Sequence, residues 1–244
     1  MVFLYAPVFL LIGFSFNASP MSVRWQGWSF DWYRQLLADQ ALFEATRNSL
    51  IIAAISTALA VVMGTGAAMV LERRAIKGVA WLNAALVLPL VIPEILMGVS
   101  LLLFFVMLRV PLGLTTVTIG HIVFNLPLVI LIIRTRLRKL DPQLEEAARD
   151  LGASPWQTFR WVTLPLLRPA IIGSALMAFT ISLDDFVVTF FTAGPGSTTL
   201  PLKVFSMIKT GITPEINALS AVLVVISMVL IGLAFILQGK PAGK

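Results

Sequence analysis

Charged side chains are scarce in this sequence of 244 residues, where Asp, Glu, Lys and Arg together make up only 12%. An average soluble domain carries about 25%, so this chain has too few charges to cover a water-exposed surface. Apolar residues, in contrast, make up 58%. The composition therefore predicts an all-α protein that crosses a membrane several times.

Cysteine is absent, and the chain contains a single histidine, His121. The first fact excludes disulfides and thiolate chemistry, and the second excludes a metal site built from several histidines. Motifs of metalloproteases, serine hydrolases and nucleotide-binding P-loops are also missing, so we expect no catalytic residues, no metal and no ATP site in this chain. The net charge of +6 does not indicate nucleic acid, because the basic residues flank apolar runs.

Six apolar runs approach or exceed the roughly 20 residues that a helix needs to cross the hydrocarbon core. They cover residues 2–16, 49–71, 79–108, 115–133, 170–192 and 216–237. The first run lacks the charged lead and cleavage site of a secretion signal, so we interpret it as a span. The third contains Pro89, Pro93 and Glu94, which predicts a kinked or broken helix.

Lys and Arg are distributed unevenly over the segments that connect these runs. With the N-terminus in the cytoplasm, 12 of the 18 basic residues fall in cytoplasmic segments and six in outer ones. Positive charge accumulates on the cytoplasmic side of membrane proteins. The sequence therefore predicts six spans with both termini in the cytoplasm.

Residues 134–165 contain ten charged side chains, and burying one such charge at the centre of a membrane costs about 2.5–3.5 kcal/mol. This segment is therefore expected to be an aqueous loop. Asp141 and Pro142 are typical of a helix start, and Gly152 is typical of a helix end. Between them, apolar residues at helical spacing form one stripe: Leu144, Ala147, Ala148 and Leu151.

A second helix is expected to begin with the capping box of Ser154 and Gln157 and to end at Pro165 and Pro169. The apolar stripe of this helix pair needs something to cover it. Either it rests on the membrane and on the chain's own spans, or it docks a cytoplasmic protein.

The same loop contains EAARDLGASPWQTFRWVTLP, from Glu146 to Pro165. This pattern resembles the EAA loop of ABC-importer membrane subunits, with Val162 in place of isoleucine. The resemblance implies that 142–165 is a pair of coupling helices that inserts into a cleft of an ATP-binding subunit. The coupling residues implied are Glu146, Ala147, Ala148, Gly152, Leu164 and Pro165.

The resemblance extends over nearly the whole chain. GWSFDWYRQLL, LDPQLEEAARDLGAS and SLDDFVVTFFTAGPGSTTLPLKVFSMIKTGITPEINAL are similar to the second permease subunit of spermidine/putrescine importers. This similarity implies six transmembrane helices in the bacterial inner membrane. It divides the chain into a first span with a periplasmic segment (1–44), a permease domain with its coupling loop at 134–169 (45–238) and a cytoplasmic tail (239–244).

The resemblance also implies partners. These are a second, non-identical permease, two ATP-binding subunits that hold the ATP and Mg²⁺, a periplasmic solute-binding protein and the membrane lipid. This chain itself would carry no cofactor. Members of the same subfamily import other amino-acid derivatives or phosphonates, so these solutes stay open as alternatives. A self-sufficient secondary transporter is disfavoured, because no clear internal repeat is visible and the docking loop is present.

Three acids lie within or at the rim of the spans, namely Glu94, Asp184 and Asp185. Ionisable groups at membrane depth are candidates for function, and carboxylates suit a cationic solute such as putrescine or spermidine. A salt bridge or a helix-end hydrogen bond is the alternative for each. Adjacent residues of a helix point about 100° apart, so one aspartate should line the pathway while the other is structural. We expect Asp185 to line it.

Small and polar residues in the spans have less specific interpretations. His121 and Asn125 are candidates for hydrogen bonds between helices. Gly64, Gly66 and Gly98 are expected to mark places where helices pack closely.

Overall fold

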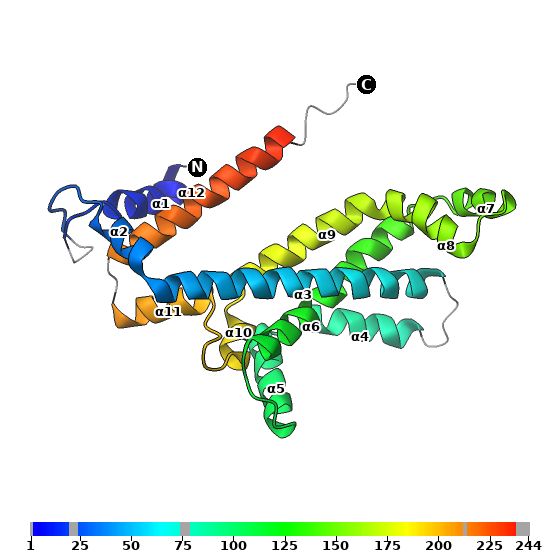
Figure 1. Ribbon diagram of the computed structural model, residues 1–244, viewed down its shortest axis with the longest axis horizontal. Coiled ribbons are helices and arrows are strands. Elements are labelled where there is room, and N and C mark those ends of the chain that lie inside the picture. Colours follow the sequence, from blue (N-terminus) through cyan, green and yellow to red (C-terminus); the bar gives the residue numbers. More distant parts are fainter. Residues whose placement is uncertain (1, 20–23, 74–78, 212–213, 238–244) are drawn as a thin grey trace. The chain divides into compact units, whose positions relative to one another are not determined.

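The computed structural model describes residues 2–19, 24–73, 79–211 and 214–237 (Figure 1). These residues form helices and loops, with one isolated backbone bridge between Asn17 and Trp28. The helices are α1 (Val2–Phe14), α2 (Asp31–Ala38), α3 (Gln40–Arg73), α4 (Val79–Val91), α5 (Glu94–Met107), α6 (Leu114–Leu137), α7 (Gln143–Asp150), α8 (Pro155–Thr158), the π-helix η1 (Phe159–Thr163), α9 (Leu164–Asp184), α10 (Val187–Thr192), α11 (Leu200–Thr210) and α12 (Pro214–Leu237). The predicted all-α class is confirmed, and the predicted tail at 239–244 lies outside the described residues.

Among the residues that the structure describes, three helical runs are long and apolar enough to cross a membrane. They are α3, α6 and the continuous run Pro155–Asp184, which consists of α8, η1 and α9. A fourth candidate is the bent pair of α4 and α5. The described parts of α1 and α12 include shorter apolar helices, Tyr5–Phe14 and Pro214–Val225.

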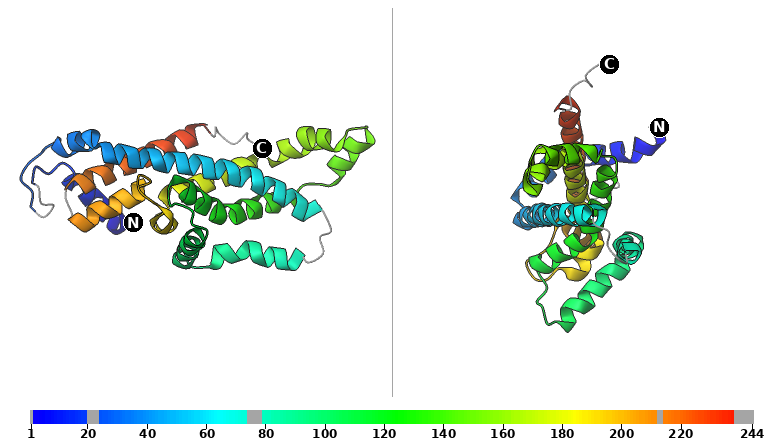
Figure 2. Two further views of the ribbon diagram at one scale, coloured as in Figure 1. Left: turned by 60° about the horizontal axis from the view of Figure 1, so that its bottom comes forward. Right: turned by 90° about the vertical axis from the view of Figure 1, so that its right-hand side faces the viewer.

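The third apolar run is broken, as its prolines predicted. Helix α4 ends at Val91, α5 begins at Glu94, and the two helices meet at 106° (Figure 2). Pro93 is the residue before α5, and its carbonyl accepts the first helical bonds from Leu96 and Met97. A proline fixes its own φ and disfavours a helical conformation of the preceding residue, which favours a turn of the chain here.

The fifth apolar run, expected as one span over 170–192, is interrupted. Helix α9 ends at Asp184, Asp185 has an extended backbone conformation, and α10 begins at Val187. The carboxylate of Asp185 accepts hydrogen bonds from the N–H groups of Val188 (3.3 Å) and Thr189 (2.8 Å). A side-chain acceptor at a helix start favours a new helix over continuation of the old one.

The prediction that the second loop helix ends at Pro165 and Pro169 was wrong. Both prolines lie in α9, Pro165 in its first turn, and the helical run is continuous from Pro155. The wider turn of η1 precedes them, with the Leu164 N–H bonded to the Phe159 carbonyl five residues back. Proline is tolerated in membrane helices where local π-helical adjustments or neighbouring groups satisfy the backbone groups that it leaves free.

The chain forms two compact units, 1–44 with 203–244, and 45–202. In the first unit, α1 and α2 pack against α12. Asp39, which follows α2, pairs with Lys203 at an N–O distance of 3.0 Å. Burial alone raises the pKa of Asp39, but the hydrogen bond and charge of Lys203 and the N–H groups of Leu42 and Ala41 together lower it below its usual 3.8.

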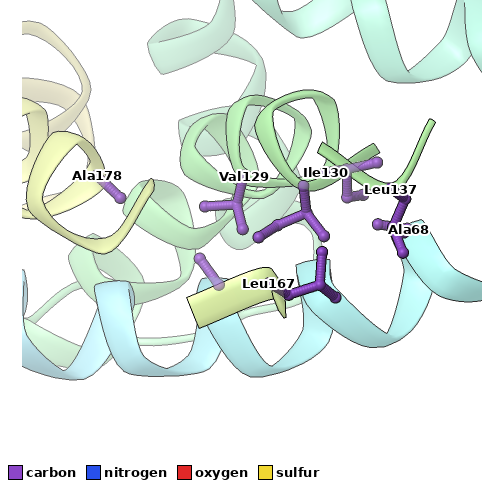
Figure 3. Packing of buried hydrophobic residues seen from close by; sticks show 8 residues of the cluster. Ala68, Val129, Ile130, Leu137, Leu167 and Ala178 are labelled. Carbon is purple, nitrogen blue, oxygen red and sulfur yellow. The ribbon is translucent and has the colours of Figure 1, made fainter. Parts of the chain in front are cut away.

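The core of the second unit lies between α3, α6 and α9 (Figure 3). Its buried members are Ala60, Ala68, Val129, Ile130, Ile133, Leu137, Leu167 and Ala178. A Cβ on Gly64 would lie 2.7 Å from the Val129 side chain, and one on Gly98 would lie 2.6 Å from Phe191. Close packing is therefore confirmed at these two glycines, whereas nothing lies within 4 Å of a Cβ at Gly66.

Candidate functional site

The first loop helix, α7, has a defined start and a defined end. The Asp141 carboxylate accepts a hydrogen bond from the Gln143 N–H (3.0 Å) where the helix begins. At the other end, the Gly152 N–H donates to the Arg149 carbonyl (2.8 Å) and the Ala153 N–H to the Ala148 carbonyl (3.0 Å). This pair of hydrogen bonds requires a residue in the left-handed backbone conformation, and Gly152 has φ +85°. The predicted glycine stop is confirmed.

The second loop helix begins at the predicted capping box. The Gln157 N–H donates to the Ser154 hydroxyl (3.3 Å), and the Ser154 N–H donates to the Gln157 side-chain oxygen (2.7 Å). Both bonds satisfy backbone donors that the first helical turn leaves free. The helix then continues through η1 into α9, so the loop is joined to a membrane span without a flexible connection.

The helix pair presents apolar side chains to solvent. Leu151 is 90% exposed, Trp161 72% and Trp156 67%, and Leu144 is also exposed. In the motif, Glu146, Ala147 and Pro165 are exposed, whereas Ala148 and Leu164 are half-buried. This surface lies at the end of the second unit where α3 also ends (Figure 1). Exposed apolar groups in such a patch are typical of an interaction surface.

A polar cluster that the sequence did not reveal fixes this loop to the spans. Glu145 forms an ion pair with Arg73 at the end of α3. Its carboxylate also accepts a hydrogen bond from the hydroxyl of Thr163 (2.7 Å), which is fully buried in η1 and accepts one from Arg73 (3.2 Å). Glu145 precedes the motif glutamate by one residue, and only the fold shows that it points inward.

A comparison of the two neighbouring glutamates gives a first prediction. Glu145→Ala leaves Arg73 and the buried Thr163 hydroxyl without their shared acceptor, so we expect the free energy of unfolding to fall by about 1–3 kcal/mol. Glu146→Ala is the matched control. Glu146 is exposed and has no hydrogen-bond or ion-pair partner among the described residues, so its loss should leave stability within about 0.5 kcal/mol. Thermal and denaturant unfolding of the purified protein measure both. Equal stability of the two variants would contradict the assigned role of Glu145.

A cavity of about 480 Å³ lies where the helices of the second unit are broken. It is lined by the end of α4, the start of α5, the middle of α6, the end of α9 and the start of α10. All three acids predicted for the pathway, Glu94, Asp184 and Asp185, line this cavity together. The breaks at Pro93 and Asp185 therefore bring together residues that lie about 90 positions apart in the sequence.

The three acids differ in their surroundings. Glu94 and Asp184 are exposed, and among the described residues neither carboxylate has a hydrogen-bond or ion-pair partner. The side chain of Asp185 is only 7% exposed and lies 3.2 Å from Nε2 of His121. Its carboxylate also accepts bonds from the Thr189 hydroxyl and the amides that start α10. The carboxylate of Asp185 thus has several hydrogen-bond partners within the protein, whereas those of Glu94 and Asp184 have none among the described residues.

His121 connects three helices in this region. Its Nδ1 lies 2.6 Å from the Ser182 hydroxyl in α9, and its Nε2 lies 2.9 Å from the Thr189 hydroxyl in α10. Ser182 in turn contacts Ser56 of α3 (3.1 Å). The expectation that His121 bonds between helices is confirmed. The same expectation for Asn125 is wrong, because neither atom of its amide has a partner among the described residues.

Nothing in the described residues resembles a metal site, since no group of three His, Cys, Asp or Glu side chains is suitably placed. The helix–glycine–helix loop is continuous with an apolar helix long enough to cross a membrane, which agrees with the resemblance of its sequence to ABC-importer permeases. The family model described as "Binding-protein-dependent transport system inner membrane component" matches residues 60–240, and the chain belongs to this family.

Comparison with individual proteins agrees. The chain is 46% identical over 231 residues to the putrescine transport system permease protein PotI of Escherichia coli (strain K12), covering 91% of this chain and 81% of that one. It is 38% identical over 238 residues to the spermidine/putrescine transport system permease protein PotC of Haemophilus influenzae, covering 98% and 93%. A putative 2-aminoethylphosphonate transport system permease protein, PhnV of Salmonella typhi, is 30% identical over 94% of this chain and 88% of its own.

Solved structures show the same fold at low sequence identity. A bacterial ABC transporter involved in the import of the acidic polysaccharide alginate superposes with a TM-score of 0.74 at 16% identity, over 98% of this chain and 92% of that one. An amino acid ABC transporter with histidines gives a TM-score of 0.65 at 16% identity, over 87% and 99%. The chain is therefore a permease subunit of an ABC importer of the inner membrane, works with other importer components and is not an enzyme.

Proposed function

We propose that this chain forms one half of the translocation pathway for a small organic dication or polycation, with putrescine and spermidine as the first candidates. The observation that carries the proposal is a pair of carboxylates, Glu94 and Asp184, that share one cavity at two helix breaks and have no partner among the described residues. Two negative charges without internal partners at membrane depth are costly, and a solute with two positive charges offsets both. The names of the more similar relatives support the same solute class.

A phosphonate is the alternative solute, because PhnV of Salmonella typhi is named for 2-aminoethylphosphonate. The ammonium group of 2-aminoethylphosphonate suits the acids as well as an ammonium group of putrescine does. Its phosphonate group, however, would be repelled by the second carboxylate. Uptake of labelled putrescine, spermidine and 2-aminoethylphosphonate by the reconstituted importer, with ATP inside the vesicles, decides between them. Uptake of only the phosphonate would contradict the proposal.

The proposed partners are a second, non-identical permease, two ATP-binding subunits that hold ATP and Mg²⁺, and a periplasmic solute-binding protein. The exposed apolar face of Leu151, Trp156 and Trp161 supports docking of 142–165 on an ATP-binding subunit, since this chain leaves the face uncovered. Of the motif residues, Glu146 and Ala147 would lie at that interface, and Gly152 would set the angle between its two helices. Leu164 and Pro165 would connect the interface to α9.

We further propose six spans with both termini in the cytoplasm, formed by α1, α3, the α4–α5 pair, α6, the run Pro155–Asp184 and α12. This arrangement places the loop at 134–169 in the cytoplasm and the segment after α10 outside. The uneven distribution of Lys and Arg supports it.

Single cysteines test this topology, because the chain has none of its own. Leu151 and Thr198 are both exposed, so Leu151→Cys and Thr198→Cys should react readily where solvent reaches them. With a membrane-impermeant maleimide, we expect labelling of Thr198→Cys in intact spheroplasts and of Leu151→Cys only after the membrane is opened. Labelling of both variants in intact spheroplasts would contradict the proposed orientation.

A further inference from the structure

Asn125 is a polar side chain whose burial the fold does not explain. It lies on α6, is 0% exposed and lines the acidic cavity. Neither its amide nitrogen nor its amide oxygen has a hydrogen-bond partner among the described residues. His121, one turn away on the same helix, uses both of its ring nitrogens. Buried amides without partners are rare because the loss of their bonds to water opposes folding.

The other groups around the cavity attract cations in two ways. Glu94 and Asp184 attract a primary and a quaternary ammonium alike through their charge, and their oxygens also accept hydrogen bonds from N–H groups. The rings of Phe124 and Phe186 also line the cavity, and aromatic faces bind both kinds of cation. The amide oxygen of Asn125 carries no charge, so it would add a hydrogen bond only to a cation with an N–H group.

We propose that Asn125 is a specificity contact of this permease, whose amide oxygen accepts an N–H from a primary or secondary ammonium group of the solute. The inference rests on the proposed function, since it takes the cavity as part of a pathway for organic cations. The carboxylates attract any cation, and the amide adds to the preference for cations that can donate a hydrogen bond. Alkylated cations without N–H groups leave the amide unpaired and pass less well.

The first test is putrescine uptake by the complete importer, reconstituted with its partner permease, ATP-binding subunits and solute-binding protein. Asn125→Leu replaces the amide with an apolar side chain of the same branching, and we expect uptake at limiting putrescine to fall about tenfold, as for one hydrogen bond to a charged group. Assembly, melting temperature and ATPase stimulation should stay close to wild type, because an unpaired amide makes no contact to lose. Thr57→Val is the matched control, since it removes a buried hydroxyl that has no partner among the described residues and does not line the cavity, and uptake should stay at the wild-type level.

The second test measures selectivity without the solute-binding protein. Calorimetry with the permease–ATPase complex compares 1,4-diaminobutane with its hexamethylated, bis-quaternary analogue. We expect the preference of wild type for the diamine to fall about tenfold in Asn125→Leu, because the carboxylates keep their own share of that preference.

Three results separate the possible explanations. Wild-type uptake and selectivity in Asn125→Leu would overturn the inference. A fall in assembly and melting temperature in step with uptake would identify Asn125 as structural, and would overturn it too. Asn125→Ala, which cannot clash, decides the matter if the leucine variant misfolds. Failure of the wild-type importer to transport any amine would instead contradict the proposed function itself.

Discussion

Replacing Gly152 with valine is expected to abolish solute uptake while leaving the chain inserted in the membrane. Gly152 has φ +85° between α7 and α8, and a Cβ added there would meet nothing within 4 Å. The effect must therefore come from the backbone. A left-handed conformation costs an L-residue roughly 1–2 kcal/mol, and a β-branched side chain makes it a marked outlier. The turn would open, and α7, which carries Glu146, would move away from the proposed ATP-binding subunit.

A substitution series at this position isolates the cause. Asn adopts the left-handed region more readily than other residues, so Gly152→Asn should keep most of the uptake. Gly152→Ala should fall between Asn and Val. Uptake in proteoliposomes, ATPase stimulation by the solute-binding protein, and membrane content by immunoblot give the three readouts. The order Asn, Ala, Val would support the turn geometry, and normal transport with Val would refute it.

Neutralising Glu94 or Asp184 is expected to lower uptake of a dication at least tenfold without loss of assembly. Glu94→Gln and Asp184→Asn keep the shape of the side chain and remove a charge that has no partner among the described residues. Two unit charges 4 Å apart interact by about 4 kcal/mol at an effective dielectric constant of 20, and tenfold corresponds to about 1.4 kcal/mol. Losing about a third of that attraction is therefore enough to lower uptake tenfold.

Asp185→Asn provides the contrast. Its carboxylate contacts His121, accepts from the Thr189 hydroxyl and caps α10, so its change should reduce assembly and uptake together. Quantitative pull-down of the partner permease, measured beside uptake of labelled putrescine, separates the two behaviours. If all three variants transport a dication like wild type, the acids do not attract the solute. The proposal would then rest on similarity to polyamine permeases alone.

The loop between α6 and α9 was predictable in detail because its geometry is local. Gly152, Ser154 and Gln157 act on backbone groups within four residues of themselves, and such bonds follow from residue type and spacing. The break at Pro93 belongs to the same class, because proline restricts its own backbone and that of its neighbour.

Other features depend on residues distant in the sequence and could not be foreseen. Asp184 and Asp185 are identical in type and adjacent, and only the position of His121 on α6 decides which one is compensated. The sequence-based prediction was that Asp185 lines the pathway, whereas the geometry favours Asp184, whose carboxylate has no partner among the described residues. Likewise, Glu145 and Glu146 differ only in that Arg73 and Thr163 lie beside the first. Pro165 does not end the helix, because η1 precedes it and it lies in the first turn of α9.

The uninterrupted run Pro155–Asp184 has a mechanical consequence. Thirty helical residues at 1.5 Å per residue make a rod about 45 Å long. Its near end carries Trp156, beside the loop turn, and its far end carries Asp184, at the acidic cavity. A rod of this length that tilts by about 10° about one end displaces the other by roughly 8 Å. Movement of a loop docked on the proposed ATP-binding subunit would thus be transmitted to the cavity wall through a single helix. The stiffness of that helix would determine how much of the displacement reaches the cavity.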